Sequence, residues 1–289
     1  MDPIDRRAFL KASTAALALA GTSAAAADAQ KDRLKKAFML GGDTPRGGIL
    51  ERFRLLKDAG FEGVEINSPG DFDRDEILKA RDETGLVIHG ICDSAHWVDT
   101  FSDPDEQVVA RGLKAARQAL ADAKVFGATT VLIVPAVVNP RVSHRQAYER
   151  SQANIRKLIP DAEAAGVKIA IEEVWNKFLL TAPEFARYLD EFQSPSVGAY
   201  FDVGNVVEYG YPQEWIRELG PRILKVHVKE YAKPKRFDYP LGEGKEIDWP
   251  AVKQAFADVK YDGWITAEVA KGDLAAMKDV ARRMDQLLG

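Results

Sequence analysis

The stretch GVKIAIE, residues 166–172, contains the pattern that decides the fold. Gly166 stands where a helix would end in a left-handed cap, and a β-branched apolar run begins immediately after it. Along that run apolar side chains alternate with Ala170 and Glu172, which is the period-two pattern of a strand with two different faces. A helix that ends in glycine and continues directly into a buried strand predicts one unit of a parallel α/β sheet.

The same unit recurs along the chain. Short apolar runs predict strands at residues 36–40, 63–67, 86–92, 129–135, 167–174, 197–203, 223–229 and 264–269. Amphipathic patterns predict helices at residues 48–59, 74–84, 105–126, 143–165, 183–192, 212–219, 249–259 and 274–288. Gly60, Gly85 and Gly127 repeat the cap of Gly166. Strand-then-helix units in this number predict an α/β fold, a single (β/α)₈ TIM barrel over residues 30–289.

Four polar residues end strands in the second half of the chain: Glu172, Asp202, His227 and Glu268. Apolar residues occupy the alternate positions of each strand and would face the helices, so the four polar side chains turn toward the barrel axis. This parity favours Glu172 over Glu173. The C-terminal ends of barrel strands are where enzymes of this fold build their active sites.

Three carboxylates and one imidazole form a hard donor set that suits one divalent metal ion. Mn²⁺ is the first expectation, and Mg²⁺, Co²⁺ and Zn²⁺ are alternatives. The competing interpretation is a buried polar cluster without metal, which would bury three carboxylates at a high cost in free energy.

Residues 1–29 follow the layout of an export signal peptide. Arg6 and Arg7 precede an Ala/Leu-rich run at residues 12–20, and small residues then form an A-x-A-like cleavage site. The paired arginines resemble a twin-arginine signal, although Asp5 stands where that pattern usually has Ser or Thr. The apolar run is too short for a stable membrane anchor, so we expect the Tat export machinery to deliver a periplasmic or secreted protein. A helical tail is the alternative interpretation.

The composition of the chain limits the kinds of partner and covalent cross-link that we expect. The chain of 289 residues carries a formal net charge of −4 without a dense stretch of Lys and Arg, which gives no electrostatic reason to expect nucleic acid binding. Cys92 is the only cysteine, so an intrachain disulfide is excluded. The sequence leaves a homo-oligomer open.

Seven segments together resemble one known family. They are GFEGVEIN (60–67), GATTVLIVP (127–135), IAIEEVWNKFLL (169–180), GAYFDVGNVVEYGYPQEW (198–215), LKVHVKEY (224–231), LGEGKEIDW (241–249) and GWITAEV (263–269). In order and placement they are similar to the xylose isomerase-like barrel superfamily, in its sugar and sugar-phosphate isomerase/epimerase branch. The resemblance covers nearly the whole chain from Phe38 onward.

The resemblance implies a divalent ion, often Mn²⁺, held by Glu172, Asp202, His227 and Glu268. It also implies that Glu172 and Glu268 serve as acid/base catalysts in an epimerase. Family members often have Asn after the first glutamate, and this chain has Glu173 there. The implied chemistry is removal of a proton next to a carbonyl, with the metal stabilising the enediolate as a Lewis acid.

The expected substrate is a small sugar, and five further residues are candidate contacts: Glu65, His96, Trp97, Trp175 and Lys229. Glu65 is inward by parity and would either bind substrate or form a structural ion pair. His96 and Trp97 follow the third strand, and Trp97 or Trp175 could pack on the C–H face of a sugar. Lys229 would neutralise a substrate oxyanion.

Several functions are compatible with this site. The leading expectation is a metal-dependent isomerase or epimerase acting on a non-phosphorylated keto-sugar, because an exported protein would meet few intracellular sugar phosphates. A lyase or hydrolase acting on keto-glycosides and a non-catalytic periplasmic sugar-binding protein are the alternatives. Zinc endonucleases that share the barrel use several histidines and a basic surface, and four histidines argue against them.

Overall fold

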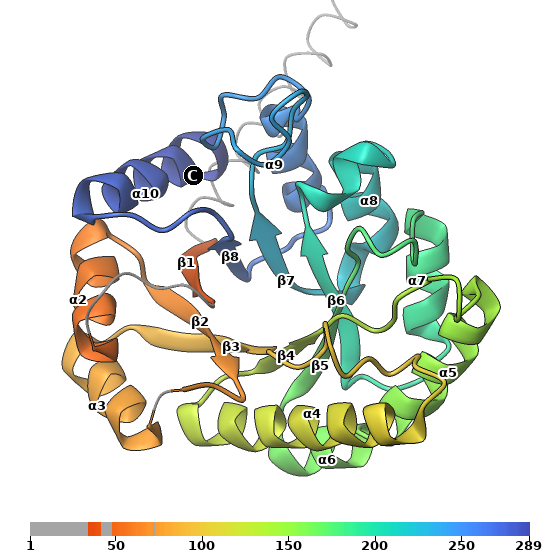
Figure 1. Cartoon of the computed structure of the whole chain (residues 1–289). Coiled ribbons are helices and arrows are strands. Elements are labelled where there is room, and N and C mark those ends of the chain that lie inside the picture. Colours follow the sequence, from red (N-terminus) through yellow and green to blue (C-terminus); the bar gives the residue numbers. More distant parts are fainter. Residues whose placement is uncertain (1–33, 42–47, 72) are drawn as a thin grey trace, which may run out of the picture.

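The computed structural model describes residues 34–41, 48–71 and 73–289, and within them eight parallel strands close into a barrel in chain order (Figure 1). The strands are β1 (Lys35–Leu40), β2 (Gly63–Ser68), β3 (Val87–Asp93), β4 (Thr130–Ile133), β5 (Lys168–Glu172), β6 (Val197–Asp202), β7 (Ile223–Val228) and β8 (Trp264–Ala267). Pairing of β1 with β8 closes the barrel, with Lys36 opposite Ile265. The predicted (β/α)₈ barrel is confirmed.

Helices form the outer layer (Figure 1). They are α2 (Ile49–Ala59), α3 (Arg74–Thr84), α4 (Glu106–Phe126), α5 (His144–Arg156), α6 (Ile159–Ala165), α7 (Ala182–Asp190), α8 (Pro212–Leu219), α9 (Trp249–Asp258) and α10 (Leu274–Leu288), with short 3₁₀ helices at Asn205–Glu208 and Gly220–Arg222. Gly60 and Gly127 end their helices with φ of 96° and 79°, a conformation that costs glycine little. The glycine caps predicted from sequence are therefore confirmed.

One predicted helix is wrong in its extent. The sequence pattern at residues 143–165 predicts a single helix, but the structure has α5 and α6 with a break at Lys157 and Leu158. Pro160 stands in the first turn of α6 and has no backbone N–H to donate to the carbonyl of Arg156. The proline therefore starts a new helix instead of extending α5.

Alternate side chains of β5 face opposite sides of the sheet, as the alternation of apolar residues in the sequence predicted. Ile169 and Ile171 lie in the large apolar core between the strands and the helices, whereas Ala170 lies in a separate cluster inside the barrel. Tyr200 is fully buried in that inner cluster and donates a hydrogen bond to Thr266 across the barrel, 3.2 Å between oxygens. The interior is thus a packed floor, and polar side chains at the strand ends lie above it.

The predicted export signal at residues 1–29 lies outside the described residues. Within the ranges that the structure does describe, no helix combines the length and the apolar character needed to cross a membrane.

Candidate metal centre

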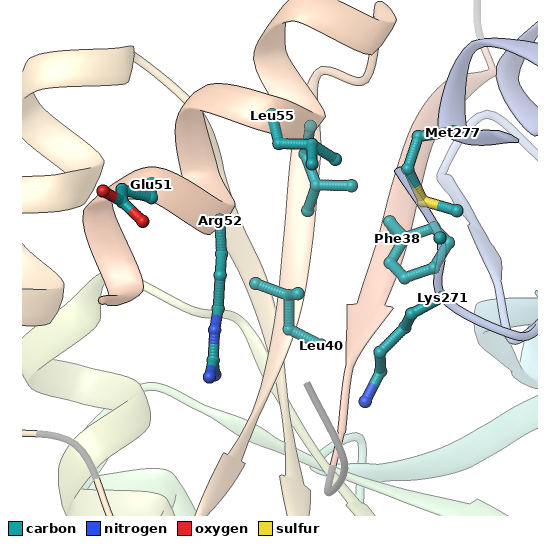
Figure 2. Close-up of a pocket in the computed structure, with 9 residues that line it drawn as sticks. Phe38, Leu40, Glu51, Arg52, Leu55, Lys271 and Met277 are labelled. Carbon is teal, nitrogen blue, oxygen red and sulfur yellow. The ribbon is translucent and has the colours of Figure 1, made fainter. Parts of the chain in front are cut away.

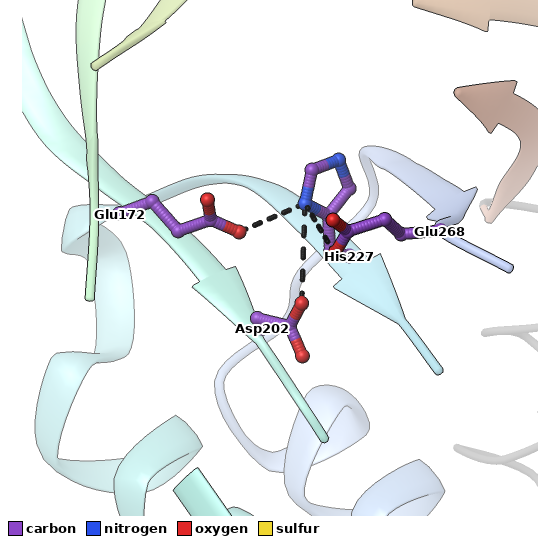
Figure 3. A group of neighbouring side chains, drawn as sticks. All are labelled: Glu172, Asp202, His227 and Glu268. Atoms are coloured by element: carbon purple, nitrogen blue, oxygen red, sulfur yellow. Dashed lines mark hydrogen bonds and ion pairs between the residues drawn. The ribbon is translucent and has the colours of Figure 1, made fainter. Parts of the chain in front are cut away.

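Four polar side chains meet at the C-terminal mouth of the barrel. Glu172 and Asp202 are the last residues of β5 and β6, His227 lies in β7, and Glu268 follows β8 directly. Each offers one ligand atom, and these atoms lie within 4.8 Å of one another. Figure 3 shows Glu172 and Glu268 reaching the group from opposite sides. The group contains Glu172 and not Glu173, as strand parity predicted.

Both ring nitrogens of His227 lie beside carboxylate groups, which fix the orientation of the imidazole. Its Nδ1 faces the three carboxylates, at 2.9 Å from Glu172, 3.6 Å from Glu268 and 4.0 Å from Asp202 (Figure 3). Its Nε2 lies 3.1 Å from Oε1 of Glu65, a fully buried carboxylate. If Nε2 donates its hydrogen to Glu65, the lone pair of Nδ1 points into the group, which is the arrangement that metal-binding histidines adopt.

Asp202 is held with one oxygen turned into the group. Its Oδ1 accepts hydrogen bonds from the backbone N–H groups of Gly204 and Asn205 at 2.7 and 2.9 Å. Its Oδ2 forms an ion pair with Nζ of Lys229 at 2.9 Å, and the same Nζ lies 2.6 Å from Glu268. Asp202 and Glu268 therefore share one lysine, Glu172 has none within the described part of the chain, and the remaining negative charge suits a divalent cation. The donor set fits a metal such as Mn²⁺.

The two glutamates have different electrostatic surroundings. Burial raises the pKa of Glu172 above its ordinary value, and His227 only partly opposes this rise. Burial also acts to raise the pKa of Glu268, but Lys229 and His227 outweigh it and hold that pKa below its ordinary value. Two carboxyl groups whose pKa values are pushed apart are a common basis for separate acid and base roles.

A cavity of about 440 Å³ adjoins Glu268 on the side of β1, β2 and β3. His96 and Trp97, two of the predicted substrate contacts, line it. His96 is buried and accepts a hydrogen bond at Nδ1 from the backbone N–H of Val134 at 3.3 Å, whereas 56% of Trp97 is exposed. The cavity therefore extends from Glu268 of the candidate metal centre to the exposed side chain of Trp97.

A second, smaller cavity of about 140 Å³ lies between β1, α2 and the segment after β8 (Figure 2). Phe38, Leu40, Leu55 and Met277 give it an apolar lining. Glu172, Asp202, His227 and Glu268 are absent from that lining, so this cavity is not where the polar group would act.

The other predicted contacts lie elsewhere. Glu65 contacts His227 and is outside the lining of the 440 Å³ cavity. Of the two roles that its sequence position left open, substrate contact or structural ion pair, this favours the structural one.

Trp175 is also outside that lining. Its Nε1 donates to the carbonyl of Asn205 at 2.8 Å, and its ring packs on Phe237 with centroids 5.0 Å apart. Lys229 is already engaged by Asp202 and Glu268.

Sequence reasoning did not predict Asp93 or Asn205 at this mouth, and it placed Asn67 inward by strand parity without assigning it to the site. Asp93 ends β3 and Asn67 lies near the end of β2, and both line the cavity. Asn205 orients Asp202 through its backbone and binds the carbonyl of Glu173 through its side chain at 2.9 Å. The strand-end rule that selected Asp202 would have found Asp93 if the third strand had been extended by one residue.

A closed parallel barrel with this polar group at its C-terminal mouth defines the class of protein as a barrel enzyme with a candidate divalent-metal site. The chain belongs to the xylose isomerase-like TIM barrel family, whose model matches residues 53–287. The family expected from the sequence motifs is therefore confirmed.

Sugar epimerases are among the proteins to which this chain is similar. L-ribulose-5-phosphate 3-epimerase UlaE of Escherichia coli O1:K1 is 26% identical over 228 residues, which cover 74% of this chain and 78% of the relative. Among solved structures, 3-keto-D-glucoside 4-epimerase YcjR from E. coli has a TM-score of 0.74 at 22% identity, covering 88% of this chain and 99% of that one. The IOLI protein, solved with a zinc atom, has a TM-score of 0.75 at 17% identity, covering 88% and 98%. The protein is an enzyme of this family.

Proposed function

We propose that this enzyme is a divalent-metal-dependent sugar epimerase that removes and returns a proton on a carbon next to a carbonyl. The observation that carries the proposal is the geometry of the barrel mouth, where Glu172 and Glu268 approach His227 and Asp202 from opposite sides (Figure 3). The epimerase activities of the relatives support the reaction class.

Glu172, Asp202, His227 and Glu268 would hold the ion, Mn²⁺ by preference. When bound, it would supply a Lewis acid that stabilises negative charge on the carbonyl oxygen of the substrate. Glu268, kept ionised by Lys229 at 2.6 Å, would remove the proton. Glu172, whose pKa is raised by burial, would return a proton from the other side and so invert the carbon. Each acid/base step contributes about 10²- to 10⁴-fold to the rate.

The substrate we propose is a non-phosphorylated keto-sugar. The export signal expected at residues 1–29 supports this substrate, because a periplasmic or secreted enzyme meets free sugars and glycosides more often than sugar phosphates. The described lining of the cavity contains the carboxylates of Asp93 and Glu268 and the ammonium group of Lys271, so its charged groups are more acidic than basic and favour a neutral sugar over an anionic one.

The test is solvent deuterium exchange into keto-sugars. The purified protein is incubated in D₂O with L-ribulose, D-psicose and a 3-keto-glucoside, with Mn²⁺ and with chelator, and deuterium is located by NMR. Metal-dependent exchange at one carbon with inversion supports the epimerase. Release of an aglycone would favour the lyase or hydrolase alternative, and binding without exchange would favour a sugar-binding protein.

Glu268→Gln separates catalysis from metal binding. The amide cannot take up the proton but keeps an oxygen in place, so exchange should fall by at least about 10²-fold while part of the Mn²⁺ affinity remains. Glu243→Gln serves as a control, because Glu243 forms an exposed ion pair with Arg283 and is outside the lining of the 440 Å³ cavity. Full turnover in Glu268→Gln would refute the catalytic assignment.

Export is tested separately from catalysis. Cells that express the full chain are fractionated, and the N-terminus of the protein from each fraction is sequenced. A periplasmic form that begins near residue 30, and its loss when Arg6 and Arg7 are both replaced by Lys, are the expected results. A cytoplasmic protein with an intact N-terminus would contradict the proposed location.

A further inference from the structure

Asp93 is a buried carboxylate that the proposed chemistry does not use. It ends β3, its exposed fraction is 0%, and it lines the 440 Å³ cavity. Its Oδ1 accepts a hydrogen bond from the backbone N–H of Ala95 at 3.1 Å. Its Oδ2 has no hydrogen-bond partner among the described residues. Since an unpaired buried carboxylate oxygen costs free energy, this arrangement needs an explanation.

The side chains around Asp93 complement a sugar. Asn67 lies on the adjoining strand β2, and its Oδ1 is likewise buried without a partner in the described structure. Burial lowers the pKa of His96 to about 3, and its Nδ1 accepts from Val134, so the neutral ring carries its hydrogen on Nε2 as a donor. Trp97 packs edge-on against His96, with ring centroids 5.0 Å apart. Acceptors, a donor and an aromatic face therefore line one cavity.

The position of this cavity relates it to the reacting groups. Glu268 belongs to its lining, whereas Asp93 and Asn67 come from β3 and β2, away from the strands that carry Glu172, Asp202 and His227. A sugar whose reacting carbon lies beside Glu268 would place its remaining carbons toward Asp93.

We infer that Asp93 is a specificity-determining substrate-binding residue, whose Oδ2 accepts a hydrogen bond from a sugar hydroxyl remote from the reacting carbon. This inference rests on the proposed function and names its substrate class: keto-sugars with free hydroxyl groups at the distal end. A phosphate oxygen has no hydrogen to donate when ionised and would meet Oδ2 as a like charge. Lys271 also lines the cavity, so the phosphorylated case has to be measured directly.

The experiment compares Asp93→Asn with the unaltered protein, both loaded with Mn²⁺, at pH 8, where a carboxyl group with a pKa of about 7 is mostly ionised. Calorimetry gives the Kd of L-ribulose, D-psicose, a 3-keto-glucoside and L-ribulose 5-phosphate, and deuterium exchange gives KM and kcat. The asparagine side chain has the same shape, and its Oδ1 still accepts the hydrogen bond from the backbone N–H of Ala95. An NH₂ group, which donates, replaces the unpaired Oδ2, which accepts. Asp71→Asn is the control, because Asp71 is an exposed carboxylate on the segment after β2.

We expect Asp93→Asn to raise Kd and KM for the preferred free sugar by about 10- to 100-fold, the effect of losing a hydrogen bond to a charged group, with a smaller change in kcat. The unaltered protein should bind L-ribulose 5-phosphate more weakly than L-ribulose, and Asp93→Asn should narrow that difference. Mn²⁺ stoichiometry should not change, and Asp71→Asn should behave as the unaltered protein.

Unchanged sugar affinity in Asp93→Asn would overturn the inference, as would equal or tighter binding of the phosphorylated sugar by the unaltered protein. Binding of no sugar probe would overturn it as well. Sugar binding without exchange would instead refute the proposed epimerase, and the role of Asp93 would still be decided by Kd.

Discussion

His227 and Glu65 form a contact that decides how the imidazole can be used. Nε2 of His227 lies 3.1 Å from Glu65, and both side chains are almost completely buried. The buried carboxylate fixes the ring orientation, and if it accepts the hydrogen of Nε2, the lone pair of Nδ1 is left for a metal ion. Glu65 would therefore orient His227 for metal binding without needing to touch metal or substrate.

Glu65→Met should lower Mn²⁺ affinity by about 10- to 100-fold, because the apolar side chain fills the space but accepts no hydrogen from Nε2. Glu65→Gln should keep most of the affinity, since its amide oxygen still accepts. Calorimetric titration with Mn²⁺ measures both. Equal affinity in Glu65→Met and the unaltered protein would show that His227 does not depend on this contact.

Asp93 should give the protein a specific dependence of stability on pH. Burial raises the pKa of Asp93 to about 7 in the folded state, above the ordinary 3.8. The folded state therefore binds the proton of the Asp93 carboxyl group more tightly than the unfolded state does. The stabilisation of the fold by this proton is complete below pH 3.8 and is lost as the pH rises through about 7. Asp93→Asn, which stays neutral, should be more stable than the unaltered protein above pH 7 and similar to it near pH 4.

Each pKa unit corresponds to about 1.4 kcal/mol. Above pH 7 the free energy of unfolding of Asp93→Asn should therefore exceed that of the unaltered protein by on the order of a few times that value. Urea unfolding at several pH values measures it, with Asp71→Asn as the control. A difference that does not grow between pH 4 and pH 7 would contradict the assigned burial of a charge. A variant that gains stability and loses sugar affinity would show that Asp93 is retained for binding.

At the scale of elements, Glu230 holds the segment between β7 and α9. Its Oε2 accepts hydrogen bonds from the backbone N–H of Gly242 at 2.7 Å and from Nε1 of Trp249 at 3.1 Å. Gly244 approaches so closely that a Cβ there would lie 2.5 Å from Oε1 of Glu230. The carboxylate thus anchors Gly242 of the segment and the first residue of α9 to the end of β7.

The segment that Glu230 anchors covers one side of the site. Its Arg236 and Phe237 lie over the ring of Trp175, at 5.2 and 5.0 Å, and Nζ of Lys229 lies 4.9 Å from the centre of the Phe237 ring. The position of Lys229 beside Glu268 therefore depends partly on how firmly this segment is held.

Glu230→Gln and Gly244→Ala should both loosen the segment. Loss of the anchor leaves a buried donor unpaired, at a cost of about 1–3 kcal/mol, so amide hydrogen exchange at residues 232–245 should become faster. kcat/KM should fall while Mn²⁺ affinity is kept. Glu243→Gln, which removes only an exposed ion pair, should have little effect. Unchanged exchange in both variants would show that Glu230 is not the anchor.

At the scale of the whole molecule, barrel closure brings together carboxylates that repel one another. Glu172 and Asp202 come from β5 and β6 and Glu268 from the position after β8, and Lys229 neutralises only part of their charge. Because the unfolded chain has no preformed site, metal binding should stabilise the folded barrel as a whole.

Removal of metal should lower the melting temperature. A ligand at 1,000 times its Kd stabilises by about 4.1 kcal/mol, and for a chain of this size each kcal/mol corresponds to about 2–4 °C. Thermal unfolding with Mn²⁺ and with EDTA measures the difference. In Asp202→Asn the difference should shrink strongly, and identical melting in both buffers would argue against a metal site in the unaltered protein.

The sequence by itself determined the barrel and its four inward polar residues. The alternation in GVKIAIE places Glu172 and Ile171 on opposite faces whatever the surroundings, because the side-chain period of a strand is local. Parallel strands then bring their C-terminal ends to one mouth. The break at Pro160 could also have been read locally, but the helical periodicity on both sides concealed it.

Only the tertiary structure decided what these residues contact. Glu65 and His227 are 162 positions apart in the chain, and no local pattern indicates that one orients the other. The engagement of Lys229 by Asp202 and Glu268, and the covering of Trp175 by Phe237, depend on where separate loops fold back. Burial of Asp93 with its Oδ2 unpaired among the described residues is likewise a property of the assembled mouth, because desolvation and distance arise only when the barrel closes.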